Sequence, residues 1–202
     1  MIKLDGLISK LPQTRFSEGN LIVLYANFKA DDKKTDGIPE YLNERLKTFT
    51  NVYGRILKSK PDRLKTEILL VSSDATLGNE IKQLLCNSNY IDVSKITIVS
   101  DKSTLADALE FVLKSIKERA NPPTVYVIAS HWYREIYDAI ETKFNGYQTH
   151  FEGALDHRPI EEIVKEKQRE TPKKGIEFYK DKAKNKALDL LLNHIFPDKK
   201  ES

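Results

Sequence analysis

Residues 124–139 read TVYVIASHWYREIYDA, and this segment indicates the class of fold most clearly. Its first seven residues are rich in β-branched and aromatic types, which predicts a buried β-strand. Ser130 and His131 end this apolar run, and residues 132–144 continue with the spacing of an amphipathic helix. A buried strand followed directly by a helix is typical of α/β proteins with a parallel sheet.

The same alternation of strand and helix runs through most of the chain. The sequence predicts further strands over 20–28, 66–73, 95–100 and 147–153, and further helices over 38–60, 76–88 and 103–119. We therefore predict an α/β, Rossmann-like, doubly wound domain over residues 1–158, with a mostly parallel five-stranded sheet and helices on both faces. The order of the strands is left open.

Residues 159–202 differ from the rest because they are dense in charge. Pro172 and Gly175 divide them into two predicted helices. The second of these helices has an apolar stripe formed by Leu188, Leu191, Leu192, Ile195 and Phe196. We expect a C-terminal helical extension that packs on the first domain or on a second copy of the chain, which makes a homodimer one candidate assembly.

Composition narrows the class of protein. The 202 residues are 40% hydrophobic and 31% charged, with a net charge of +3, so we expect a soluble domain without a nucleic-acid or membrane partner. Cys86 is the only cysteine, which excludes an internal disulfide and suits a reducing compartment. Because no stretch is long and apolar enough for a membrane span, and the N-terminus is too polar for a signal peptide, a cytoplasmic location is expected.

Polar residues follow each predicted strand, where open α/β sheets bind their ligands. If the strands are parallel, these clusters meet at one edge of the sheet and form a candidate ligand site. A fifth cluster after the last strand holds Glu152, Asp156, His157 and Arg158. The residues predicted to line the site are Asn27, Lys29, Ser72, Ser73, Asp74, Glu80, Ser103, Thr104, Ser130, His131 and Arg134.

His131 and Arg134 are the strongest pair among these candidates. They lie three residues apart at the start of a helix, where free backbone N–H groups and the helix dipole favour an anion. Arg134 could bind a phosphate or carboxylate through two parallel hydrogen bonds, with help from Lys29, and His131 could transfer a proton as acid or base. Glu80 could orient the imidazole or bind a ligand hydroxyl.

Each cluster also has a purely structural interpretation. Ser72, Ser73 and Asp74 precede a predicted helix, as do Ser103 and Thr104, and such residues commonly cap helix N-termini. His131 and Arg134 could likewise be solvated residues at the start of a helix.

Well-known signatures are missing from the chain. It has no GxGxxG, P-loop or GxSxG motif, so a standard dinucleotide, NTPase or esterase site is not supported, and no cofactor is indicated. His150, Glu152, Asp156 and His157 are conceivable metal ligands. Because they show no HExxH or CxxC pattern, we expect no metal site.

From about residue 20 to residue 152, the order of short motifs resembles the YdcF/SanA/ElyC-like family, the domain of unknown function numbered 218. Glu44-Arg45-Leu46 matches the Arg-Leu pair of the first helix, and LLVSSDATLGNE matches a serine turn followed by a helical Glu, here Glu80. DKSTLADA resembles the Ser/Thr segment, and SHWYR has the H-x-x-R spacing of His131 and Arg134. The glycines usual after the first two strands are replaced here, so a divergent member is expected.

Together these features predict binding of a small anionic ligand, nucleotide-like or phosphorylated, at the carboxyl edge of the sheet. The protein could then be a hydrolase or a transferase. The alternative is a non-catalytic ligand-sensing or protein-interaction module that uses the C-terminal helices. The sequence does not decide between an enzyme and a binding module.

Overall fold

The computed structural model describes residues 19–27, 38–58, 65–102, 104–117, 119 and 121–170. The chain divides into two compact units, residues 1–158 and 159–202, which are treated separately below. Among the predicted site residues, Lys29 and Ser103 lie outside the described residues, as does the second predicted helix of the tail.

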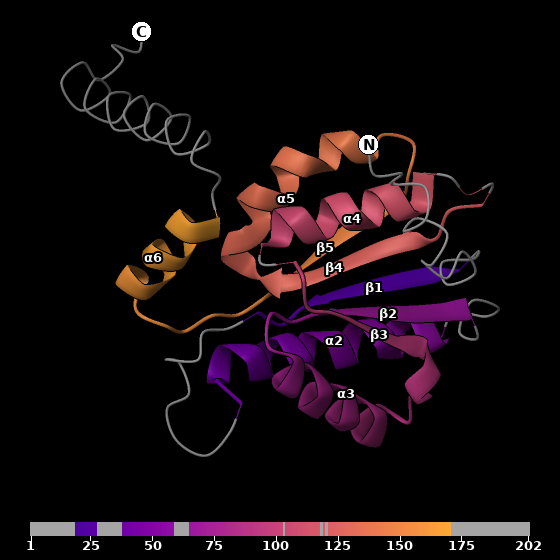
Figure 1. The fold of residues 1–202 in the computed structure, drawn as a ribbon, viewed down its shortest axis with the longest axis horizontal. Helices are drawn as coiled ribbons and strands as arrows, with labels where there is room; N and C mark the ends of the chain where they lie inside the picture. Colours follow the sequence, from indigo (N-terminus) through magenta and orange to yellow (C-terminus); the bar gives the residue numbers. More distant parts are fainter. Residues whose placement is uncertain are drawn as a thin grey trace, which may run out of the picture. The chain divides into compact units, whose positions relative to one another are not determined.

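The first unit is built on five parallel strands: β1 (Asn20–Tyr25), β2 (Thr66–Val71), β3 (Ile96–Val99), β4 (Thr124–Ser130) and β5 (Thr149–Ala154). Their order in the sheet is β3-β2-β1-β4-β5 (Figure 1). This confirms the predicted Rossmann-like fold. Because the chain moves outward from β1 to β3 and then returns to the other side of β1, the strand order reverses between β1 and β4.

Helices cover both faces of this sheet (Figure 1). α2 (Glu40–Lys58) and α3 (Ala75–Asn89) lie on one face, and α4 (Leu105–Lys117) and α5 (Arg134–Glu141) lie on the other. A short turn, η3 (Val93–Lys95), precedes β3. The helix predicted over 132–144 is instead α5 flanked by two 3₁₀ turns, η4 (His131–Tyr133) and η5 (Thr142–Phe144). Such turns commonly form at the ends of α-helices.

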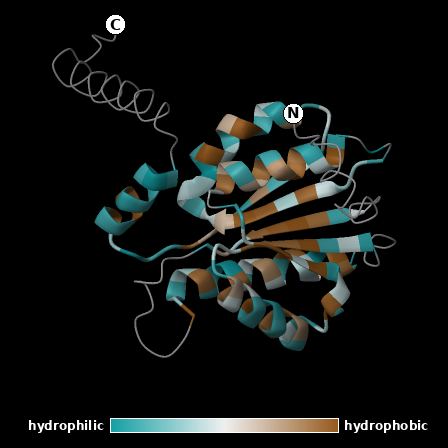
Figure 2. Ribbon diagram, in the orientation of Figure 1, coloured by the Kyte–Doolittle hydropathy of each residue, from teal (hydrophilic) through white to brown (hydrophobic). Residues whose placement is uncertain are grey.

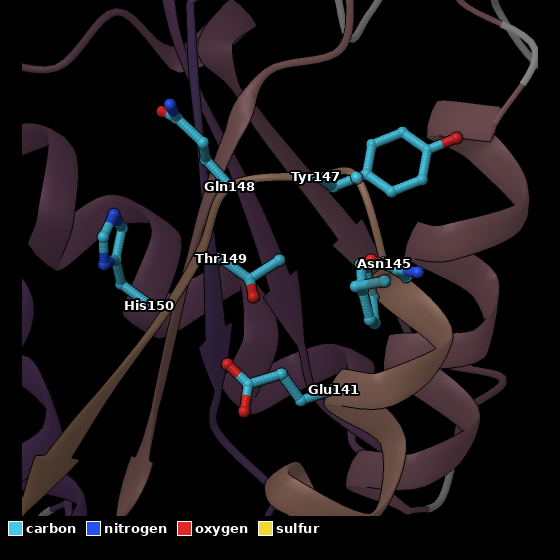
Figure 3. Close-up of a pocket in the computed structure, with 8 residues that line it drawn as sticks. Glu141, Asn145, Tyr147, Gln148, Thr149 and His150 are labelled. Atoms are coloured by element: carbon cyan, nitrogen blue, oxygen red, sulfur yellow. The ribbon is translucent and has the colours of Figure 1, made fainter.

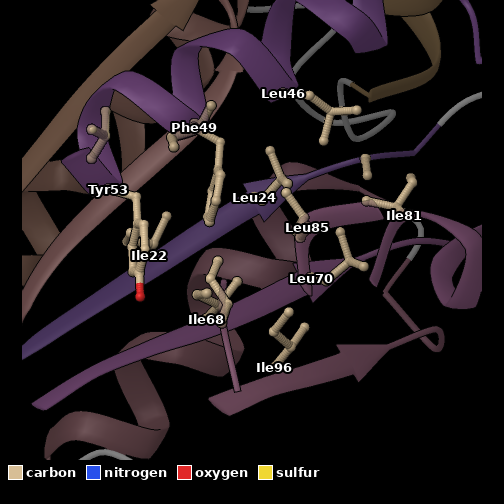
Figure 4. Close-up of a cluster of buried hydrophobic side chains, with 14 of the residues drawn as sticks. Ile22, Leu24, Leu46, Phe49, Tyr53, Ile68, Leu70, Ile81, Leu85 and Ile96 are labelled. Atoms are coloured by element: carbon tan, nitrogen blue, oxygen red, sulfur yellow. The ribbon is translucent and has the colours of Figure 1, made fainter. Parts of the chain in front are cut away.

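The burial of the central strands explains why they could be predicted from the sequence. All six residues of β1 are buried, so the strand forms a continuous apolar run, as expected between two helical layers. Ile22 and Leu24 pack with Phe49 of α2 and Ile81 of α3 in one cluster (Figure 4). Figure 2 shows the hydrophobic strands at the centre and hydrophilic residues on the outer surfaces of the helices.

The second unit contains α6 (Ile160–Glu170), which matches the first of the two helices expected in the tail. Glu161 and Glu162 lie in its first turn and Lys167 and Arg169 in its last, an arrangement that complements the helix dipole. Within the described part of the chain, no helix combines the length and the apolar composition that a membrane crossing requires.

Candidate functional site

The guanidinium of Arg45 fills the point where the strand order reverses. Arg45 lies in α2, and its side chain is 0% exposed. Its Nε and Nη2 donate to Ser130 Oγ at the end of β4, at 3.0 and 2.9 Å. Its Nη1 donates to the carbonyl oxygens of Tyr25 and Asn27 at the end of β1, at 3.0 and 3.3 Å. One side chain therefore joins the carboxyl ends of β1 and β4.

Three tyrosine rings surround the same guanidinium. Its central carbon lies 5.8, 5.1 and 5.6 Å from the ring centroids of Tyr25, Tyr41 and Tyr133. The face of an aromatic ring attracts a cation, so these rings stabilise the charge of Arg45 where water is excluded. Tyr133 also stacks on Trp132, with 3.7 Å between the ring centroids.

Asp156 connects to this arrangement through Ser130. Its carboxylate accepts from Trp132 Nε1 at 3.0 Å and from Nη2 and Nε of Arg158 at 2.7 and 2.9 Å. Burial alone would raise the pKa of Asp156. The hydrogen bonds from Arg158 and Trp132, the charge of Arg158 and a hydrogen bond from Ser130 outweigh this effect and hold that pKa far below its usual range. Asp156 is therefore ionised at neutral pH.

Arg158 closes the network by returning to α2. Its guanidinium carbon lies 3.8 Å from the centroid of Tyr41, the residue that follows the first position of α2. Because Arg158 also pairs with Asp156, the segment that follows β5 is fastened to the start of α2. The four polar side chains Arg45, Ser130, Asp156 and Arg158 are called the carboxyl-edge network below.

The charges in the carboxyl-edge network are unevenly matched. Asp156 forms a direct ion pair with Arg158, and Ser130 separates it from Arg45. All hydrogen-bond acceptors of Arg45 are neutral oxygens, and it forms no ion pair within the described residues. A buried charge without an opposite charge in contact raises the free energy of the folded state. The burial of Arg45 therefore needs a functional explanation.

Asn27, a predicted ligand-binding residue, connects the segments that follow β1, β2 and β3 by hydrogen bonds. Its Nδ2 donates to Tyr25 Oη and to the carbonyl oxygen of Lys102, both at 3.2 Å, and its Oδ1 accepts from the backbone N–H of Ser73. Since Ser73 follows β2 and Lys102 follows β3, the polar clusters after three strands do meet at one edge of the sheet.

The helix-capping interpretation is confirmed for two of the predicted site residues. Asp74 accepts from the backbone N–H groups of Thr76 and Leu77 at 2.8 and 3.1 Å, at the N-terminus of α3. Thr104 Oγ1 accepts from the backbone N–H of Asp107 at 3.0 Å. Ser72 is buried, and its hydroxyl donates to the carbonyl oxygen of Asp74 at 2.8 Å. These side chains stabilise the starts of α3 and α4.

The residues predicted to act together on a ligand are exposed and have separate surroundings. His131 is exposed at the end of β4, and Glu80 is exposed on α3. Arg134 Nε donates to Asp138 at 2.7 Å, and this hydrogen bond raises the pKa of Arg134. Within the described residues, no hydrogen bond or ion pair joins any two of His131, Arg134 and Glu80. Their joint action on one ligand remains a prediction.

His131 lies unusually close to β5. A Cβ atom placed on Gly153 would be 3.0 Å from the Cα of His131 and 3.2 Å from its Cβ. Real Cβ atoms rarely make such short contacts, so any larger residue where β5 passes η4 would require its neighbours to shift by a few tenths of an ångström.

Three of the four conceivable metal ligands, His150, Glu152 and Asp156, contact different partners. His150 stacks on Tyr126, with ring centroids 5.0 Å apart, and Glu152 pairs with Arg55 of α2 at 2.5 Å. Asp156 belongs to the carboxyl-edge network. In the part of the chain that the structure describes, no group of three or more His, Cys, Asp or Glu side chains is placed to hold a metal ion.

Arg45 was absent from the predicted site, although the sequence contains a signal for it. Leu42, Leu46 and Phe49 form the apolar stripe of α2, and Arg45 falls within that stripe at helical spacing. A charged residue on the buried face of a helix is unusual and needs a buried partner.

No protein-family model, curated protein or solved structure matches this chain. Its function must therefore be inferred from the geometry of the site.

Proposed function

We propose that this protein binds a small anionic ligand, nucleotide-like or phosphorylated, at the carboxyl edge of the sheet beside the ends of β1 and β4. The observation that supports this most strongly is Arg45, a guanidinium with 0% exposure whose hydrogen-bond acceptors are all neutral. In open α/β sheets, ligands commonly bind where the strand order reverses. Arg45 occupies that position here.

Electrostatics explains why the buried guanidinium of Arg45 favours an anion nearby. Burying a cation away from an opposite charge costs several kcal/mol as an order of magnitude, even after the protein relaxes. The low dielectric around a buried charge also strengthens its attraction for an anion nearby. An anion at the surface above Arg45 would therefore lower the free energy of the native state, although it need not touch the guanidinium.

The exposed residues around this point supply the contacts. His131 follows β4 directly and can donate to an anion or transfer a proton if the ligand is turned over. Arg134 lies one turn further along, and its guanidinium would exchange its exposed partner Asp138 for the ligand. Such an exchange costs little because exposed ion pairs contribute about 0–1 kcal/mol.

The order of the sequence motifs provides separate support. The resemblance to the YdcF/SanA/ElyC-like family covers Arg45, Glu80, His131 and Arg134. We include Arg45 in the proposed site as a buried positioning residue that attracts the ligand by its charge. Hydrolysis or group transfer would require His131 as the acid or base, whereas simple binding would not.

Thermal-shift measurements with adenosine monophosphate, ribose 5-phosphate and inorganic phosphate test the proposal, and S-adenosylmethionine, which carries a net positive charge, serves as the cationic comparison. A ligand that binds only the native state raises its melting temperature, so at least one anion should do so. His131→Ala and Arg134→Ala should each weaken the best ligand about tenfold, which corresponds to about 1.4 kcal/mol. Arg55→Ala, an exposed change on α2, is the matched control and should leave the affinity unchanged.

Two results would remove the proposal. One is the absence of any stabilisation by the three phosphate compounds at millimolar concentration. The other is an affinity that neither the His131 nor the Arg134 variant changes. Because both side chains are exposed, the two variants should fold, and a change in affinity can be assigned to the site.

A further inference from the structure

A second pocket lies at the opposite end of the sheet, at the amino end of β5. Its volume is about 530 Å³, and residues from the end of α5, η5 and the turn into β5 line it (Figure 3). This volume lies within the range of small-molecule sites. Its distance along the strands from the carboxyl-edge network makes it independent of the proposed anion site.

Two side chains that line this pocket, Glu141 and Thr149, are joined by the hydroxyl of the buried Tyr137, and these two hydrogen bonds have only one consistent direction. Tyr137 Oη lies 3.1 Å from Glu141 Oε1 and 2.8 Å from Thr149 Oγ1. A tyrosine hydroxyl has one proton, and a carboxylate oxygen can only accept. Tyr137 therefore donates to Glu141, and Thr149 donates to Tyr137. Burial, followed by the influence of Glu141, raises the pKa of Tyr137, which keeps this proton in place.

This direction leaves acceptors facing the pocket. Glu141 Oε2 has no hydrogen-bond donor among the described residues, and the oxygen of Thr149 has already given its proton to Tyr137. Figure 3 shows the carboxylate of Glu141 and the hydroxyl of Thr149 turned toward each other, with Asn145 and Tyr147 on the same side of β5. A ligand that fits this wall must supply hydrogen-bond donors.

The charges around the pocket also favour a ligand that supplies hydrogen-bond donors. Glu141 is the only acidic residue that lines it, and no Lys or Arg is among the eight lining residues. The nearest guanidinium on the same helix, Arg134, is paired with Asp138 at 2.7 Å. Lys143, just after α5, is paired with Glu110 of α4 at 2.6 Å. Besides the hydrogen bond to Asp138, the charge of Glu141 contributes to raising the pKa of Arg134. Within the described residues, however, no Lys or Arg forms a direct ion pair with the carboxylate of Glu141, which leaves room for a cation from solution.

We propose that this pocket binds a small hydroxylated amine, whose primary ammonium group donates to Glu141 and Thr149 while its hydroxyl groups bond to the polar rim. The rim offers donors as well as acceptors, because Gln148 Oε1 accepts from Thr124 Oγ1 and its Nε2 is left to donate. A charge-assisted hydrogen bond to a carboxylate is about twice as strong as a neutral one, so the ammonium group should dominate affinity.

Glucosamine and glucose are matched probes because they differ at a single substituent, an ammonium in place of a hydroxyl. Both are titrated into ¹⁵N-labelled full-length protein at mildly acidic pH, where the amine is protonated, and amide shifts of residues 144–150 are followed. Glucosamine should shift these amides in a saturable way with a millimolar dissociation constant. Glucose should bind at least about tenfold more weakly, the value that one charge-assisted bond would produce.

Glu141→Gln removes the charge but keeps an oxygen that accepts from Tyr137, so the wall of the pocket should remain intact. This variant should bind glucosamine about tenfold more weakly. Glu110→Gln, an exposed glutamate that pairs with Lys143, is the control and should bind as the unchanged protein does. Equal affinity for glucose and glucosamine, unchanged binding by Glu141→Gln, or no saturable shifts of these amides would each overturn the proposal.

Discussion

At the carboxyl ends of β1 and β4, the buried side chains of Arg45, Ser130 and Asp156 are hydrogen-bonded in one network. At the amino end of β5, by contrast, the half-buried side chains of Glu141 and Thr149 line a pocket. Both places bring a charged side chain and a hydroxyl together. They differ in what satisfies the remaining hydrogen-bonding groups. In the carboxyl-edge network other protein groups do so, whereas the groups that line the pocket are open to a ligand.

This difference has an energetic meaning. Removing one member of a buried network leaves its partners without water, so the protein loses the full cost of their desolvation. Removing a member of a pocket wall lets water replace it, so the loss is small. The carboxyl-edge network should therefore determine stability, and the pocket should affect stability much less.

The largest expected effect comes from Arg45→Ala. It creates a cavity and leaves the Ser130 hydroxyl and two backbone carbonyl groups without their donor, so the free energy of unfolding should fall by about 3–5 kcal/mol. Arg55→Ala, a change on the same helix at a side chain that is 62% exposed, should cost less than about 1 kcal/mol. Urea unfolding at neutral pH measures both. Equal losses would show that the guanidinium of Arg45 is not buried as described.

Asp156→Asn tests the network through pH. Because the folded state depresses the pKa of Asp156, its contribution is complete above the unfolded-state pKa of about 4 and is lost as the pH falls below that value. The variant should be about 2–4 kcal/mol less stable than the unchanged protein at neutral pH, and this gap should shrink in acid. Urea unfolding across the acidic range measures it.

Asp101→Asn is the control for this experiment. Asp101 lies at the same edge of the sheet, but its side chain is 72% exposed and pairs with Lys102. Its effect should stay below about 0.5 kcal/mol at every pH. A gap for Asp156→Asn that does not change with pH would contradict the role of the ionised carboxylate.

The smallest effect is expected at the pocket. Tyr137→Phe removes the buried hydroxyl between Glu141 and Thr149, but both of these half-buried side chains line the pocket and can bond to water instead, so the loss should be about 0.5–1.5 kcal/mol. Tyr90→Phe, at a side chain that is 95% exposed, should change nothing measurable. Thermal and urea unfolding compare the two. A loss at Tyr137 as large as that at Asp156 would erase the contrast between the two ends of the sheet.

The fold was predictable because it depends on periodic patterns. Each strand expected between residues 20 and 153 is present within a few residues of its predicted bounds. The central strands β1, β2 and β4 are largely buried and therefore form apolar runs that are easy to recognise in the sequence. The cap formed by Asp74 was predictable too, because it is a local interaction. The helix predicted over 132–144 was only partly correct, because apolar spacing does not distinguish an α-helix from the 3₁₀ turns that flank it.

The carboxyl-edge network was harder to predict because its members are far apart in sequence. Arg45 and Ser130 are 85 residues apart, and nothing local in either segment identifies the partner. Charged residues are also expected at the surface, so the position of Arg45 in the apolar stripe of α2 was the only sign of its burial. Asp156 and Arg158 were recognised as a polar cluster, but their connection to β4 depends on the tertiary fold.

Gly153 has a consequence for how β5 finds its place as an edge strand. It pairs with Ala129, and a Cβ atom at this position would lie 3.0 Å from the Cα of His131, which is tighter than most real Cβ contacts. Sliding β5 by one residue would bring Glu152 or Ala154 to that position, where even a methyl group would require its neighbours to shift by a few tenths of an ångström. The absence of a side chain at residue 153 thus favours the native alignment of β5, because neighbouring registers would crowd His131.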